Sequence, residues 1–167
     1  PPPNISCRYF TYSTEFIILA RKSPKVAHCF NYDLMKELNG NKQMTDVWQL
    51  PAIGKWEKSC GKHPTQKPLG VLARLIQAST SPGAWILDPF SGSATTGIAA
   101  NLLGRRYLGL EIEDEFLEMS KARRMELERP AIRNNYLERL AKARHILPPD
   151  NFFVAGGDDL NYGVPWL

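Results

Sequence analysis

The sequence lacks several features that would assign it to a class at once. Its longest apolar stretches, such as residues 16–20, are far shorter than the roughly 20 residues of a membrane-spanning helix, and its beginning does not have the pattern of a secretory signal peptide. It has only three cysteines, at positions 7, 29 and 60. An odd number at wide spacing argues against a disulfide framework, so we expect a cytoplasmic protein without a membrane partner.

Excess positive charge is absent from most of the chain. The formal net charge is +4 at pH 7. Residues 1–62 carry all of this excess, with nine Lys or Arg against five Asp or Glu, whereas residues 63–167 carry twelve of each. A basic segment is the electrostatic footprint of a surface that binds a polyanion. Charge alone does not separate this interpretation from an ordinary solvated basic surface.

The first 62 residues show little regular pattern. Residues 1–13 are irregular and Pro-rich, and the branched apolar run EFIILAR at 15–21 predicts a short buried strand. Residues 22–62 are polar, basic and interrupted by glycine and proline, with isolated aromatic residues. This composition indicates an irregular insertion.

A regular alternation of elements begins near residue 68. We predict helices after Pro68, over 95–103 up to Gly104, from Asp114 and after Pro130, with strands over 84–87 and 107–112. No element is expected from residue 148 onward. Helices alternating with short apolar strands are typical of an α/β fold with a parallel sheet, in which ligands bind at the carboxyl ends of the strands.

The segment DPFSGSATTG at 88–97 carries the most information. Gly92, Ala94 and Gly97 nearly match the dinucleotide fingerprint G-x-G-x-x-G, between a predicted strand and a predicted helix. Glu111 ends the next predicted strand, 19 residues after Gly92, where a carboxylate can accept hydrogen bonds from ribose hydroxyls. The arrangement predicts a nucleoside-containing cofactor. The alternative is a tight strand-to-helix turn beside an unrelated glutamate.

Asp88 discriminates between two such cofactors. A pyrophosphate at this loop would face the carboxylate of Asp88, which is unfavourable between like charges, and the methyl group of Ala94 stands where a pyrophosphate needs close backbone approach. The ammonium and sulfonium of S-adenosylmethionine suit Asp88, and its carboxylate suits the helix N-terminus at Thr95 and Thr96. Phe90 is expected either against the apolar parts of this ligand or in the core.

The segment HPTQKP at 63–68 is weak evidence by itself, because a surface turn has the same composition. Combined with the other motifs it is specific. Over about residues 1–124, the chain resembles the beta-class DNA amino-methyltransferases of bacteria. The segments that carry this resemblance are PPN, RYF and STEF near the start, followed by HPTQKP, a helix, ILDPFSGSATTGIAA and RRYLGLEIEDEF. Those enzymes transfer a methyl group from S-adenosylmethionine to the exocyclic amine of adenine or cytosine.

The resemblance implies a partial Rossmann-like, three-layer α/β fold that binds S-adenosylmethionine and acts on double-stranded DNA. The implied cofactor-binding residues are Thr65, Lys67, Asp88, Phe90, Gly92, Ser93, Thr95, Thr96 and Glu111. Among them, Glu111 would bind the ribose, and Thr65 and Lys67 would approach the methionine carboxylate. The basic stretch would be a short target-recognition region, with Lys42, Lys55 and Lys58 on the DNA. Ala94 stands where glycine is usual in the family, so a positive φ there would be strained.

The family's catalytic loop is absent from the sequence. That loop is an Asp, Asn or Ser followed by Pro-Pro and an aromatic residue; it orients the target amine and stacks on the flipped base. No such segment occurs here. We therefore expect a fragment that lacks catalytic residues, as a proline at position 1 also suggests, with the loop upstream of residue 1. Adenine N6 is the expected target of the parent enzyme; a homodimer, common among relatives, has no signature in the sequence.

The expected organisation has four parts and leaves three other interpretations open. The parts are the end of the catalytic half (1–23), the target-recognition region (24–62), the cofactor-binding half (63–129), and a helix with a tail (130–167). A zinc module would use His28, Cys29, Cys60 and His63, but their spacing fits no common finger, and no metal is expected. An NAD-dependent oxidoreductase would share the fold class. A non-enzymatic DNA-binding relative would have lost its catalytic half.

Overall fold

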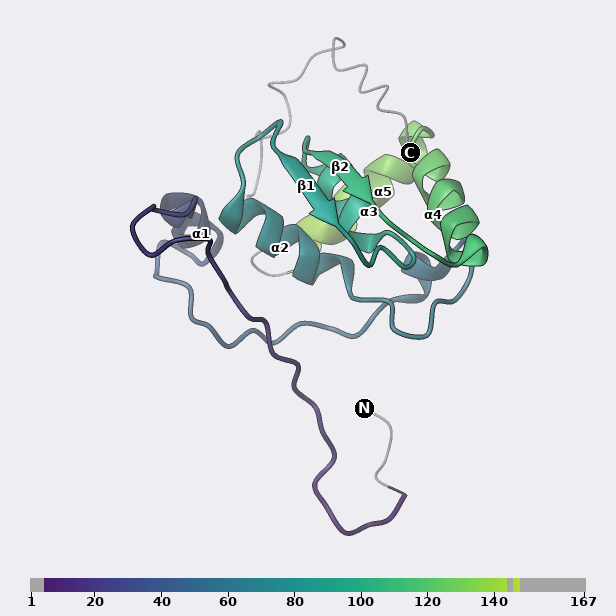
Figure 1. Ribbon diagram of the computed structural model, residues 1–167, viewed down its shortest axis with the longest axis horizontal. Coiled ribbons are helices and arrows are strands. Elements are labelled where there is room, and N and C mark those ends of the chain that lie inside the picture. The colour runs from purple at the N-terminus through teal and green to yellow at the C-terminus, as the bar shows by residue number, and fades with distance from the viewer. Residues whose placement is uncertain (1–4, 144–145, 148–167) are drawn as a thin grey trace.

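The computed structural model describes residues 5–143 and 146–147. Its elements are α1 (Tyr32–Leu38), the 3-10 helix η1 (Lys55–Lys58), α2 (Leu69–Ser79), β1 (Trp85–Asp88), α3 (Thr95–Leu102), β2 (Arg106–Gly109), α4 (Asp114–Glu126) and α5 (Pro130–Lys142) (Figure 1). The predicted order of elements from residue 68 to α5 is confirmed, and so is the α/β class. The tail from residue 148 lies outside the described residues. None of the helices within the described ranges has the length and apolar character needed to cross a membrane.

The sheet consists of two parallel strands joined through α3. β1 and β2 pair in register, with Asp88 opposite Gly109 at their carboxyl ends. Main-chain hydrogen bonds continue past both strands, from Leu110 N to Asp88 O and from Ser91 N to Leu110 O, each 2.9 Å. The loops that follow the two strands are therefore held together at one edge of the sheet, where the predicted cofactor residues lie.

The core lies on one face of this sheet, under α2, α3 and α5 (Figure 1). Its fully buried side chains include Leu69, Ile98, Leu102, Leu140 and Ile146. Ile86 and Tyr107 point inward from the strands and pack against this cluster. Burial of these apolar surfaces, at about 25 cal/mol per Å², fixes the helices relative to the strand ends.

Gly97 accounts for the last glycine of the fingerprint. A Cβ at Gly97 would stand 2.6 Å from the ring of Tyr107, well inside any real contact. Glycine therefore permits α3 to lie close against β2. Larger residues at position 97 would separate the helix from the strand and displace the loop that precedes it.

The other face of the sheet is uncovered within the described residues. Trp85, Leu87 and Leu108 point to this face and are 57%, 62% and 37% exposed. Soluble proteins rarely leave such contiguous apolar side chains open to water. The described residues therefore supply two layers of the three expected, which is the partial form of the fold.

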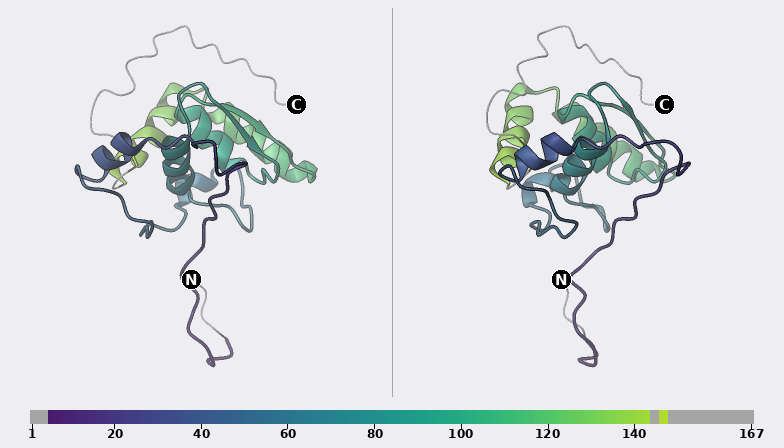
Figure 2. Two further views of the ribbon diagram at one scale, coloured as in Figure 1. Left: turned by 60° about the vertical axis from the view of Figure 1, so that its left-hand side comes forward. Right: turned by 90° about the vertical axis from the view of Figure 1, so that its left-hand side faces the viewer.

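The strand predicted over residues 15–21 is wrong. No strand is present there, and Phe16, Ile18 and Leu19 are 91%, 90% and 74% exposed. The segment connects the projecting N-terminal end of the chain to the part that leads into α1 (Figure 2). A strand needs a neighbour for its backbone N–H and C=O groups, and neither β1 nor β2 lies beside this segment. An apolar run indicates a tendency to be buried but does not supply the partner.

The stretch 22–62 is more ordered than its composition indicates. It contains α1, which contacts the C-terminal end of α2 through a hydrogen bond from Asn31 N to Ala78 O (2.8 Å). It also contains η1 at the other end of α2, where Glu57 Oε2 accepts the N–H of Leu69 (2.7 Å). The expected irregular insertion thus spans the length of α2 and is fixed to it at both ends.

Candidate cofactor site

The loop after β1 starts at Asp88 and is fixed to the sheet by its own polar groups. Asp88 Oδ1 accepts the N–H of Phe90 (3.1 Å), and the hydroxyl groups of Ser91 and Tyr107 are 2.8 Å apart. Burial raises the pKa of Tyr107 to about 12, so this hydroxyl stays protonated at neutral pH. The side chain of Phe90 is 90% exposed. Of the two roles expected for Phe90, core packing is therefore excluded.

Glu111 lies directly against this loop. Its Oε2 accepts the N–H of Gly92 (2.6 Å), and its Oε1 accepts the N–H groups of Ile112 (2.9 Å) and Glu113 (3.0 Å). The N–H of Glu113, followed by those of Gly92 and Ile112 and the neighbouring His63, lowers the pKa of Glu111, while partial burial acts in the opposite direction. Glu111 and Gly92, which are 19 residues apart in the sequence, are thus in direct contact through the carboxylate and the N–H of the first glycine of the fingerprint.

Gly92 brings a second segment to the site. Its φ of +52° is left-handed, which glycine adopts freely, and a Cβ there would stand 3.0 Å from Nε2 of His63. The ring of His63 also meets Phe116 edge to face, with centroids 4.2 Å apart. The Nδ1 of His63 accepts the N–H of Thr65 (3.2 Å). His63 therefore joins the 63–68 segment to the cofactor loop.

The two predicted residues of the 63–68 segment have different surroundings. Thr65 is exposed beside His63, with 3.4 Å between Oγ1 and Nδ1. Lys67 Nζ forms an ion pair of 2.7 Å with Glu15 Oε2, and both side chains are largely exposed. An exposed pair contributes only about 0–1 kcal/mol. The ammonium of Lys67 is thus paired with Glu15, and little free energy opposes its release.

The side chains of Ser93 and Thr95 point away from any ligand at the loop. They are 3% and 6% exposed. Arg123 of α4 donates through Nη1 to Ser93 O, to Ser93 Oγ (3.1 Å) and to Thr95 Oγ1 (3.2 Å). Burial lowers the pKa of Arg123. Only the backbone of positions 93–95 and the first turn at Thr96, which is partly exposed, remain for a cofactor. Ala94 has φ +54°, so the positive φ considered from the sequence is present.

The three lysines expected to bind DNA are not brought together. Lys55 and Lys58 belong to η1, which lies at the N-terminal end of α2. Lys42 follows α1, which contacts the C-terminal end of α2. With a rise of about 1.5 Å per residue, these ends are roughly 15 Å apart. A separation of this size corresponds to several phosphates of a duplex, whose charges recur about every 1.7 Å along its axis.

The aromatic residues of this region are engaged by arginines of the core helices. The guanidinium of Arg74 lies 4.8 Å from the ring centroid of Trp48, and that of Arg139 lies 5.2 Å from Trp56. Trp56 also packs edge to face on Tyr136, with centroids 5.1 Å apart. Their first role is therefore to attach the basic stretch to the fold.

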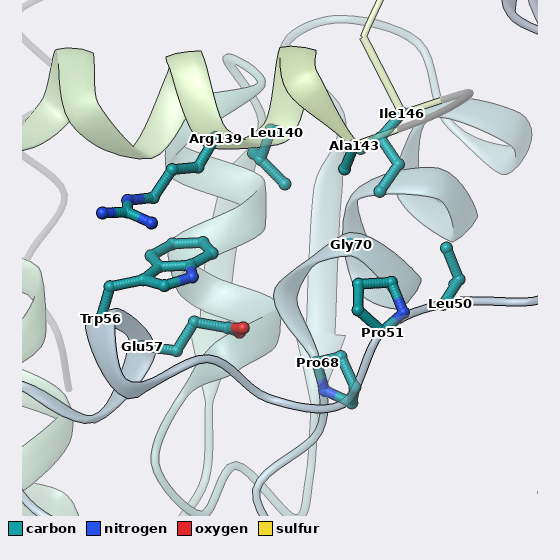
Figure 3. Close-up of a pocket in the computed structure, with 10 residues that line it drawn as sticks. All are labelled: Leu50, Pro51, Trp56, Glu57, Pro68, Gly70, Arg139, Leu140, Ala143 and Ile146. Atoms are coloured by element: carbon teal, nitrogen blue, oxygen red, sulfur yellow. The ribbon is translucent and has the colours of Figure 1, made fainter.

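A small pocket opens beside Trp56, between η1, the start of α2 and the end of α5 (Figure 3). Trp56, Glu57, Arg139 and Leu140 contribute to its wall. None of the predicted cofactor residues lines it. We interpret it as a packing gap where the basic stretch meets α5, separate from the cofactor site.

The zinc alternative finds no set of ligands in the described ranges, where no group of three or more His, Cys, Asp or Glu side chains could hold a metal ion. Cys29 lies next to Asn31 at the C-terminal end of α2. His63 lies at the cofactor loop. The fold thus separates the two halves of the proposed metal motif.

Comparison with known proteins follows the same motifs. Residues 1–122 match the family model N6_N4_Mtase, described as DNA methylase. The chain belongs to this DNA methylase family. It is 61% identical over 142 residues to the Type II methyltransferase M2.MboI of Moraxella bovis, covering 85% of this chain and 52% of that protein. It is 58% identical over 124 residues to M2.DpnII of Streptococcus pneumoniae, covering 74% of this chain and 46% of that protein.

The DNA methylase chain spans about half the length of the curated relatives it matches. Among solved structures, the crystal structure of the M1.HpyAVI-SAM complex is 34% identical and aligns with a TM-score of 0.46 over 59% of this chain and 45% of that chain. The family resemblance expected from the motifs is confirmed.

Arg123, His63 and Glu57 make structural contacts that were not predicted from the sequence. Arg123 is one of several charged residues on α4, His63 was considered only within its motif, and Glu57 stood among basic residues. Family motifs give no signal for Arg123. Glu57 stands three residues after Gly54 and accepts its N–H (3.1 Å), which is the half of a capping box that the glutamate supplies.

Proposed function

We propose that this chain is the cofactor-binding half of an S-adenosylmethionine-dependent DNA methyltransferase that modifies base amino groups, with adenine N6 as target. The observation that carries the proposal is the contact between Glu111 and the N–H of Gly92 at 2.6 Å. It joins the loop after β1 to the end of β2 at the carboxyl edge of a parallel sheet, where such folds bind nucleoside ligands.

The residues at this edge fit S-adenosylmethionine better than a dinucleotide. Asp88 and Glu111 place two carboxylates beside the loop, which opposes a pyrophosphate and favours an ammonium. Three backbone N–H groups leave Glu111 one of its roughly four acceptor sites for a ribose hydroxyl, and the exposed ring of Phe90 offers an apolar surface. The first turn of α3 at Thr96, together with Thr65 and Lys67, would bind the methionine carboxylate. When bound, S-adenosylmethionine supplies an electrophilic methyl group on sulfur.

The remaining chemistry belongs to the parent enzyme. We propose that it flips the target base out of the duplex and orients its amine by a Pro-Pro-aromatic loop, which has no counterpart in this sequence. The contribution of this chain is the position of the donor. This division agrees with the comparisons, in which the chain matches 52% and 46% of the length of two curated relatives.

Calorimetry of the 167-residue chain with S-adenosylhomocysteine and with NADH tests the cofactor assignment. Binding of S-adenosylhomocysteine in the absence of NADH binding is expected. Asp88→Asn should weaken it by about tenfold, through loss of one charged contact of about 1.5 kcal/mol. Asp33→Asn on the exposed surface of α1 is the matched control. Tight binding of NADH with no response to S-adenosylhomocysteine would instead favour the oxidoreductase.

The DNA contact of the basic stretch is tested by charge reversal. Lys55→Glu combined with Lys58→Glu should weaken binding of duplex DNA and make the plot of log K against log salt shallower by about 1 to 2, because each phosphate contact contributes about 0.9. Lys42→Glu should act separately, since this residue lies at the other end of α2. Lys121→Glu on α4 is the control. A salt slope equal to that of the wild type in the first variants would place the DNA on another surface.

A further inference from the structure

Arg123 is a buried side chain that contacts the cofactor loop and that the proposed function does not use. It is 2% exposed, on α4, 28 to 30 residues from its partners. Its three hydrogen bonds through Nη1 all reach Ser93 and Thr95. A charged group is buried only at a cost unless it is well paired, so this placement calls for a reason within the loop.

The reason lies between the two partners of Arg123. Ala94, at φ +54° and ψ 37°, is the N-cap of α3 in the left-handed conformation and is fully buried. Residues with a Cβ disfavour this conformation, and only surrounding contacts keep them in it. The side chains on either side of Ala94 are both attached to Arg123. The guanidinium therefore holds the strained residue from both sides.

The same contacts determine what the loop presents to a ligand. Because the hydroxyl groups of Ser93 and Thr95 are turned inward, the outer side of the turn consists of backbone and the start of α3. Gly92, next to this turn, gives its N–H to Glu111 (2.6 Å). A relaxed Ala94 would rotate the peptide groups on both sides of it and shift Gly92 away from the carboxylate.

We propose that Arg123 is a positioning residue for the cofactor: by holding Ala94 in the left-handed conformation, it fixes the backbone of the loop and the contact between Gly92 and Glu111. The inference rests on the proposed function, since it concerns the affinity of that site. Arg123 does not touch the cofactor in this account and acts only through the loop.

The test is the affinity of the chain for S-adenosylhomocysteine, measured by calorimetry beside thermal unfolding. Arg123→Met, which keeps most of the side-chain volume, should weaken binding by about tenfold. Adding Ala94→Gly to Arg123→Met should restore most of the affinity, because glycine adopts the left-handed conformation without a contact to hold it. Arg124→Met, a neighbour paired with Glu128 on the outer side of α4, is the control and should bind as the wild type does.

The rescue separates positioning from a general effect on folding. A purely structural Arg123 predicts that affinity follows thermal stability and that Ala94→Gly restores neither. If Arg123→Met does not fold, Ser93→Ala with Thr95→Ala removes two of the three acceptors, and a loss of about threefold, again reversed by Ala94→Gly, is expected. Unchanged affinity in Arg123→Met, or a loss that glycine does not reverse, overturns the inference. A wild-type chain that does not bind S-adenosylhomocysteine contradicts the proposed function itself.

Discussion

Glu111→Ala is expected to weaken the binding of S-adenosylhomocysteine by about 100-fold, the largest effect of any single change at the site. A hydrogen bond from a ribose hydroxyl to the one acceptor site that the carboxylate keeps free is worth about 1.5–3 kcal/mol, since the acceptor is charged. The substitution also removes the acceptor of the Gly92 N–H (2.6 Å), so the loop loses its contact with the end of β2. Calorimetry of the purified chain measures the change. Glu115→Ala, an exposed residue of α4, is the control.

The pH dependence of binding identifies the ionised form of Glu111 as the one that acts. Because the backbone N–H of Glu113 and its neighbours lower the pKa of Glu111, the contribution of this group is complete above the ordinary glutamate pKa of about 4.3. It is lost only as the pH falls through the lowered value. Wild-type affinity should therefore hold at mildly acidic pH. In Glu111→Gln the affinity should be lower at neutral and mildly acidic pH and should lack the component that titrates with Glu111. Equal affinity of the two proteins at neutral pH would remove Glu111 from the ribose site.

The part of the fold that sequence predicts well is the part governed by local rules. Glycine at positions 92, 97 and 104 marks the two ends of α3, and each has a local reason: positive φ at 92 and 104, and close packing on Tyr107 at 97. Strands β1 and β2 are short apolar runs on either side of that helix. Residues 15–21 have the same composition but not the same outcome, because a strand depends on a neighbour that composition does not specify.

The direction of side chains in the loop was beyond sequence reasoning. The family resemblance implies that Ser93 and Thr95 bind the cofactor, which stays a prediction, and the structure shows that the side chains of both accept hydrogen bonds from Arg123. Two features decide this. The left-handed Ala94 reverses the chain direction between them, and α4 places a guanidinium beneath the turn. Neither a backbone angle nor a contact across 30 residues leaves a periodic trace in the sequence.

Glu57 is a second residue whose role could not be predicted from the sequence. Its carboxylate lies in a basic stretch but stabilises the fold. The residue is 4% exposed. Its Oε1 accepts the N–H of Gly54 (3.1 Å) and its Oε2 that of Leu69 (2.7 Å), while its main-chain oxygen accepts Nε2 of Gln66 (2.9 Å). The carboxylate thus caps η1 and the first turn of α2 together, at the positive end of that helix dipole. Figure 3 shows it beside Trp56, under α5.

Glu57→Ala is therefore expected to destabilise the chain by about 3 kcal/mol, because it leaves two backbone N–H groups without their charged acceptor in a buried place. For a domain of this size the midpoint of thermal unfolding should fall by roughly 10 °C, which circular dichroism would record. Glu57→Gln keeps the shape and one acceptor and should lose less than half of that. Glu37→Ala, an exposed glutamate of α1, removes the same charge and should stay within about 0.5 kcal/mol of the wild type. If Glu57→Ala unfolds at the same temperature as Glu37→Ala, the carboxylate does not anchor the basic stretch to α2. In that case the order of residues 50–62 has to come from other contacts, such as those of Trp56 with α5 and of Ser59 with Glu126.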